Sequence, residues 1–93
     1  MKHIGYFYIR VVDSFRFDIY QNNDNVFVNI RNKIYKINLP KKYLSLDDKI
    51  HITLFDALEY AEYVNLIKEN KPPKYITIND EKIKNDNIID FIV

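Results

Sequence analysis

The first forty residues alternate between apolar and polar side chains with a period of two. This period is typical of strands that bury one face of a sheet, and here it predicts four strands joined by short turns. The side chains predicted to be buried are Phe7, Ile9 and Val11, then Phe15, Phe17 and Ile19, then Val26, Val28 and Ile30, and finally Tyr35, Ile37 and Leu39.

Asparagines set the expected register between these strands. Asparagine tolerates the positive φ of two-residue hairpin turns, so Asn22-Asn23 and Asn32-Lys33 are predicted to be turns. The first turn pairs Ile19 with Val26, and both turns align apolar with apolar positions throughout. The four strands should therefore form an antiparallel meander.

A three-residue loop at residues 12–14 is predicted to join the opening strand, about residues 3–12, to the second strand. An odd number of loop residues keeps the apolar side chains of both strands on one face. This loop places Arg10 opposite Arg16, a like-charge pair that would be mildly unfavourable unless an anionic group lies between them.

The alternation with a period of two ends near residue 40. Pro40 ends the sheet because it cannot donate to a ladder of hydrogen bonds, and residues 41–52 are predicted to be a connector with a short extended piece at its end. Thr53 resembles a helix N-cap, and the residues from Leu54 to about Glu69 are good or neutral helix formers.

One stripe of this predicted helix is apolar and should cover the sheet. Its members are Ala57, Tyr60, Ala61, Val64 and Ile67. Phe55 and Leu66 fall on the opposite side, among glutamates, so they should contact another part of the chain or a partner.

The C-terminal part contains a second set of turn signals. Pro72-Pro73 should stop the helix, and Asn79-Asp80 should join strands at 75–78 and 81–84 in a hairpin. Asn85 is then expected to cap a short last helix, with a strand over 88–93 as the alternative. The resulting fold class is α+β, with the order ββββαββα and helices packed on one side of the sheet.

Composition restricts the chemistry that the chain can perform. Ninety-three residues, 29% of them charged, suit one ordered domain covering residues 1–93, and the absence of cysteine excludes disulfides and thiolate metal sites. With a single glycine, Gly5, no phosphate-binding loop can be written. His3 and His51 are 48 positions apart, and each is expected to be a surface or strand histidine, not a metal ligand or a base. We therefore expect no enzyme, no cofactor and no metal site.

Charge is unevenly distributed along the chain. Residues 1–46 hold eight Lys and Arg against three Asp, and residues 47–93 hold six Lys against ten Asp and Glu, which gives +5 and −4. The register above places the arginines and several aromatic residues on the sheet face that points away from the helix. The candidate partner-binding residues on this face are Tyr6, Tyr8, Arg10, Arg16, Tyr20, Phe27, Arg31 and Lys36.

Arginine interleaved with aromatic side chains suits the docking of an acidic protein surface or stacking on bases. An ordinary solvent-exposed sheet face would have a similar composition, because Tyr and Arg are well tolerated in strands. The leading hypothesis is a small binding or inhibitor protein that acts on a protein or nucleoprotein. The alternatives are a single-stranded nucleic-acid-binding domain and a homo-oligomeric, for example homodimeric, subunit.

Two further expectations concern the source and location of the protein. Lysine outnumbers arginine 11 to 3, a bias that AT-rich codons produce. This bias and the small size suggest a viral or mobile-element protein of the anti-CRISPR kind. No apolar run approaches the roughly 18–20 residues that cross a bilayer, so a cytoplasmic protein without a membrane partner is expected.

Overall fold

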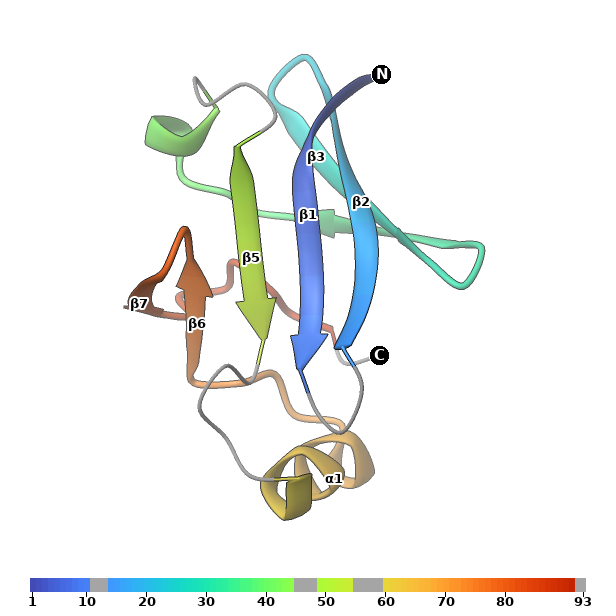
Figure 1. The fold of residues 1–93 in the computed structure, drawn as a ribbon, viewed down its shortest axis with the longest axis vertical. Helices are drawn as coiled ribbons and strands as arrows, with labels where there is room; N and C mark the ends of the chain where they lie inside the picture. Colours follow the sequence, from blue (N-terminus) through green and yellow to red (C-terminus); the bar gives the residue numbers. More distant parts are fainter. Residues whose placement is uncertain (11–13, 45–48, 55–59, 92–93) are drawn as a thin grey trace.

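The chain forms one mixed sheet of seven strands, with one short 3-10 turn and one α-helix among the residues that the structure describes. The computed structural model describes residues 1–10, 14–44, 49–54 and 60–91. The expected α+β class with the order ββββαββα is therefore wrong, because the described part of the chain is mostly β (Figure 1).

The strands lie in the order β4-β3-β2-β1-β5-β6-β7. All neighbours are antiparallel except β1 and β5, which are parallel. The strands are β1 (Lys2–Arg10), β2 (Ser14–Asn22), β3 (Asn25–Ile30), β4 (Lys33–Ile37), β5 (Ile50–Leu54), β6 (Tyr75–Ile78) and β7 (Glu81–Lys84), and the 3-10 turn η1 spans Lys41–Tyr43.

The antiparallel meander of β1 to β4 is confirmed, but each of its two hairpin turns lies one residue away from the expected position. The turns are Asn23-Asp24 and Arg31-Asn32, and Arg31 and Asn32 both have positive φ. Ile19 consequently pairs with Val28 instead of Val26. Moving a two-residue turn by one residue changes every pairing by two positions, so the side chains of β2, β3 and β4 stay on the expected faces. The expected burial of Phe15 is wrong, because this residue near the end of the sheet is 44% exposed.

β1 ends at Arg10 and β2 begins at Ser14, whereas the loop was expected at residues 12–14; residues 11–13 lie outside the described residues. Arg16 therefore lies opposite Tyr8, and Arg10 lies opposite Ser14, so the expected Arg10–Arg16 pair is wrong. A bulge between His3 and Gly5 also changes the alternation at the start of β1.

The largest correction concerns residues 50–54. Ile50, Ile52 and Leu54 are buried while His51 is exposed, which is the alternation of a strand. Thr53 therefore caps no helix; it lies in β5, which pairs with β1 on one side and with β6 on the other. The chain reaches β5 by a long crossover from β4, and this crossover brings the second half of the sequence into the same sheet.

The helix α1 is described over Tyr60–Glu69, and it does not lie across the sheet as expected; residues 55–59 of the expected helix lie outside the described residues. It sits beyond the end of the sheet where β1 and β5 finish (Figure 1). Val64, the expected centre of the buried stripe, is 39% exposed, whereas Leu66 packs against the core. Phe55, the other residue of the second apolar side, lies outside the described residues.

Asn70 ends the helix. Its φ is 54°, and the backbone N–H of Lys71 donates to the carbonyl of Leu66 at 3.1 Å. This geometry is the Schellman arrangement, in which a residue in the left-handed region follows the last helical turn. The prolines after it continue into β6, and the hairpin of β6 and β7 has the expected bounds and the expected turn, Asn79-Asp80.

Residues 85–91 form neither the expected helix nor the alternative strand. Asn85 caps this segment through its side chain instead: its amide N–H groups donate to the carbonyls of Pro73 and Ile89, each at 2.8 Å, and its oxygen accepts from the N–H of Ile89 at 2.9 Å. The expectation that Asn85 caps a helix is therefore wrong, because its side chain closes a loop.

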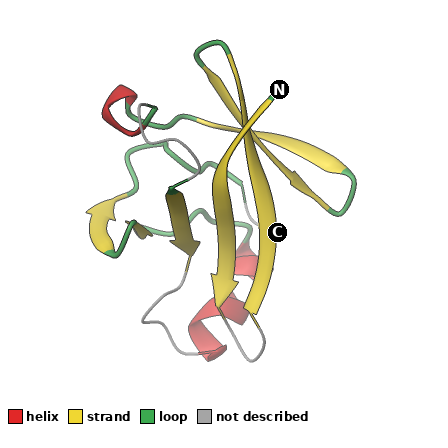
Figure 2. Cartoon of the chain, turned by 45° about the horizontal axis from the view of Figure 1, so that its top comes forward, coloured by secondary structure: helices red, strands yellow, loops and turns green. Residues whose placement is uncertain are grey.

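The C-terminal segment completes the core. The sheet is curled, so that the β3–β4 hairpin and the segment after β7 pass behind β1 and β5 in Figure 1, and Figure 2 shows this hairpin crossing the other strands steeply. Ile88 and Ile89 are buried, and Phe91 stacks on Tyr35 at 4.4 Å between ring centroids and packs on Phe7 at 6.0 Å. The inner face of the curled sheet and the C-terminal segment therefore enclose a single core.

Candidate functional site

The sheet has an outer face that no other described segment crosses in front of β1, β2 and β5 (Figure 1). Its residues follow from the register as three rows that run across the strands. The first row is Lys36, Phe27, Tyr20 and His3; the second row is Asp18, Tyr6 and His51; the third row is Arg16, Tyr8, Thr53, Thr77 and Lys82. We call these twelve residues the outer face.

Tyr6 is the centre of the outer face. Its ring lies 5.0 Å from that of His3, 6.2 Å from that of Tyr8 and 6.0 Å from that of His51, measured between centroids. The contacts with both histidines are edge-to-face, the arrangement that the aromatic quadrupole favours. The rings therefore hold one another in place before any partner binds.

Arg16 covers the ring of Tyr6. The central guanidinium carbon lies 3.3 Å from the ring centroid, a close cation–π contact. This contact packs the side chain of Arg16 on a half-buried ring although the residue itself is exposed. The planar guanidinium is thereby positioned on the outer face with hydrogen-bond donors available around its edge.

The two histidines of the chain both lie on this face, on either side of Tyr6. The Nε2 atom of His3 lies 3.0 Å from a carboxylate oxygen of Asp18. The backbone of His51 is fixed by the β6–β7 turn, because its N–H donates to the side-chain oxygen of Asn79 at 2.8 Å and its carbonyl accepts from the N–H of Asn79 at 2.9 Å.

Neither histidine was expected on this face, for two different reasons. Strict alternation places His3 on the buried side together with Phe7, and only the bulge turns it outward. Gly5 inside a strand pattern was the available signal, since an isolated glycine in a strand often marks a bulge or a close backbone approach. His51 was missed because a helix was expected to begin at Thr53. This expectation hid the alternation of buried and exposed positions from Ile50 to Leu54.

The structure also changes the distribution of charge. The outer face carries three cationic side chains, Arg16, Lys36 and Lys82, and one carboxylate, Asp18, which is paired with His3. Lys82 comes from the half of the sequence with a net charge of −4, so the division into a basic and an acidic half does not describe the folded molecule. The face is more positive than the whole chain, whose formal net charge is +1.

Not every expected binding residue belongs to this face. Six of the eight lie on it: Tyr6, Tyr8, Arg16, Tyr20, Phe27 and Lys36. Arg31 lies in the turn of the β3–β4 hairpin, whose tip reaches away from β1 and β2 at the right of Figure 1. Arg10 ends β1 in the register of this face, and its side chain lies outside the described ones.

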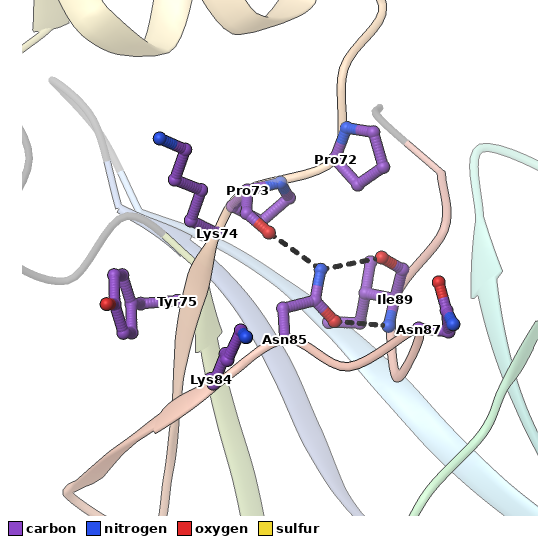
Figure 3. A pocket seen from close by; sticks show the side chains of 8 residues that line it. All are labelled: Pro72, Pro73, Lys74, Tyr75, Lys84, Asn85, Asn87 and Ile89. Carbon is purple, nitrogen blue, oxygen red and sulfur yellow. Dashed lines mark hydrogen bonds between the residues drawn. The ribbon is translucent and has the colours of Figure 1, made fainter.

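A pocket of about 350 Å³ opens where β6 and β7 meet the C-terminal segment (Figure 3). It is lined by Pro72, Pro73, Lys74, Tyr75, Lys84, Asn85, Asn87 and Ile89. Figure 3 shows the amide of Asn85 between Pro73 and Ile89, bonded to both. The central polar group of this pocket is therefore used to hold the C-terminal segment.

A second pocket, of about 340 Å³, lies between η1 and β7 and is lined in part by Tyr43. Tyr43 is 6% exposed, and its hydroxyl is buried and makes no hydrogen bond to a described residue. Lys42 lies with its amine 5.0 Å from the centroid of the Tyr43 ring, and Lys84 and Asp86 line the opposite part. The lining charges have opposite signs and select no ligand class.

No three His, Asp or Glu side chains of the described residues gather closely enough to hold a metal ion. In the described part of the chain no helix has the length and apolar character needed to cross a bilayer. No family model, no curated protein and no solved structure matches this chain. The outer face is consequently the main source of functional information.

Proposed function

We propose that the chain is a small binding protein whose outer face docks an anionic surface of a macromolecular partner. The observation that supports this most is the packing of Arg16 on Tyr6 inside a preassembled group of rings. Arginine and tyrosine are the usual anchors of binding surfaces, and holding them in place beforehand lowers the entropy lost on binding.

The positive charge of the outer face supports an anionic partner. Three cations surround the aromatic centre, and the one carboxylate is paired with a histidine. Complementary charge raises the rate of association and discriminates against cationic partners. The narrower hypothesis of a cytoplasmic inhibitor of the anti-CRISPR kind rests on the small size of the chain and on its excess of lysine over arginine, which AT-rich codons produce. It remains part of this proposal.

Affinity purification from cells that naturally express the protein tests this function. Arg16→Glu should weaken capture of the partner by more than tenfold, because it replaces attraction by repulsion at the centre of the face. Arg31→Glu is the matched control, since it changes the charge equally at the hairpin tip. Undiminished capture by Arg16→Glu, with loss of capture by Arg31→Glu or by Asp86→Lys, would move the site away from the outer face.

A further inference from the structure

The chemistry of the outer face is dominated by planar groups. Seven of its twelve residues carry a flat aromatic, imidazole or guanidinium group. One exposed aliphatic side chain, Ile34, lies on the same side of β4 as Lys36, beside these residues. Arginine and tyrosine also anchor protein partners, but every nucleic-acid base offers a π-face that stacks on such planar groups. This composition therefore suits the stacking of bases.

The cations are placed where a polyanionic chain would need them. The third row runs from Arg16 on β2 to Lys82 on β7, across four strand intervals, which corresponds to roughly 19 Å at the usual strand spacing. Tyr8, Thr53 and the buried Thr77 lie between the two cations. A span of this size suits the smallest site sizes of single-strand-binding sheets, about four nucleotides.

From these observations, and resting on the proposed function, we infer that the partner is a single-stranded nucleic acid that crosses the strands of the outer face. Its phosphates contact Arg16, Lys36 and Lys82, and its bases lie on the exposed surfaces of Tyr8, Tyr20 and Phe27. These rings are half-buried, so each rests on the sheet and leaves part of its surface to a base.

The ring packing also determines how the bases bind. The rings of His3, Tyr6, Tyr8 and His51 that contact one another are 5.0–6.2 Å apart, centroid to centroid. A base between two rings needs about twice the stacking distance of 3.4 Å. Bases therefore lie on top of the face and do not insert between these rings. Such binding reads no hydrogen-bond pattern and should tolerate many sequences.

Fluorescence anisotropy with labelled dT20 and rU20 tests this inference on the full chain. Three phosphate contacts predict a slope of log affinity against log salt of about −2, so affinity should fall about 20-fold between 50 and 200 mM NaCl. Arg16→Glu should weaken binding more than tenfold, and Arg31→Glu should leave it within twofold. Circular dichroism and thermal melting of both variants verify that the fold is unchanged.

A labelled 20-residue polyglutamate separates stacking from charge. Tyr8→Ala and Phe27→Ala should each weaken dT20 binding several-fold and leave polyglutamate binding unchanged, since only the bases use the rings. If polyglutamate binds in an Arg16-dependent manner and neither oligonucleotide binds, the nucleic-acid inference is overturned while the proposed function stands. Equal loss of dT20 binding in Arg16→Glu and Arg31→Glu overturns the assignment to the outer face.

Discussion

The carbonyl group of Ile50 on β5 occupies the space that a β-carbon would need at Gly5 on β1. The only glycine of the chain thus lies at a close approach of the two parallel strands, beside the bulge that turns His3 outward. Close backbone approach is one of the few reasons for a glycine inside a strand. Its role is structural, which agrees with the absence of any glycine-rich binding loop.

Gly5→Ala should therefore be among the most damaging single substitutions in the chain. The added methyl group overlaps backbone atoms, which cannot rotate away as a side chain could, so we expect a loss of more than about 2 kcal/mol in the free energy of unfolding. Urea denaturation measures it. Asn29→Ala, at an exposed position of β3, is the control and should change stability by no more than about 0.5 kcal/mol.

Phe91→Ala should show that the C-terminal segment is part of the core. The ring of Phe91 joins β4 to β1 through Tyr35 and Phe7, and the residue is partly buried. A loss of about 2–3 kcal/mol is expected, below the usual cost for a fully buried phenylalanine. Phe91→Tyr keeps the stacked ring and should remain close to the wild type in thermal melting. An unchanged melting curve for Phe91→Ala would contradict this packing.

Asn85 offers a test of a single side-chain amide. Asn85→Ala removes three hydrogen bonds and should cost about 2–3 kcal/mol. Asn85→Asp keeps an acceptor for Ile89 but turns a carboxyl group toward two carbonyl oxygens, which raises the pKa of that carboxyl in the folded state. The folded state then binds more protons than the unfolded state, so Asn85→Asp should be less destabilised at pH 4 than at pH 7.

The β3–β4 turn should be open to stabilisation. Arg31 and Asn32 have φ values of 50° and 66°, and Asn-Gly is the pair that suits such a turn best. Replacing Arg31 by Asn together with Asn32 by Gly should add about 0.5–1 kcal/mol, or roughly 3–6 °C in Tm, because the relief of unfavourable positive φ outweighs the entropy that the new glycine adds to the unfolded chain. The same double variant should bind dT20 as the wild type does, because the tip lies away from the outer face. A lower Tm would contradict the assigned turn.

The first half of the fold could be predicted from the sequence because its signals are local. Alternation assigned the faces of β1 to β4, and those faces survive a turn displaced by one residue, as the pairing of Ile19 with Val28 shows. The β6–β7 hairpin was equally predictable, since Asn79-Asp80 stands between two strands of four residues. The pairing of these strands follows from residues within the strands and the turns that join them.

The rest required knowledge of distant contacts. The alternation in β5 covers only five residues, which is too short to outweigh the helix N-cap signal at Thr53. Its partner β1 also lies far away in sequence. Placing His51 and Lys82 on the outer face depended on that pairing. The aromatic part of the candidate site could thus be predicted, whereas the histidines and the cation from β7 could not.

The parallel pairing of β1 with β5 has a consequence for the order of folding. Gly5 meets Ile50 across 45 positions of chain, whereas the hairpins of β2 to β4 and of β6 to β7 close through two residues. Because the entropy of closing the long loop is lost before its contacts are gained, the hairpins should form first, each with an uncovered apolar face. The middle of the sheet is then the last part to assemble, and during synthesis β1 has no second neighbour until β5 leaves the ribosome.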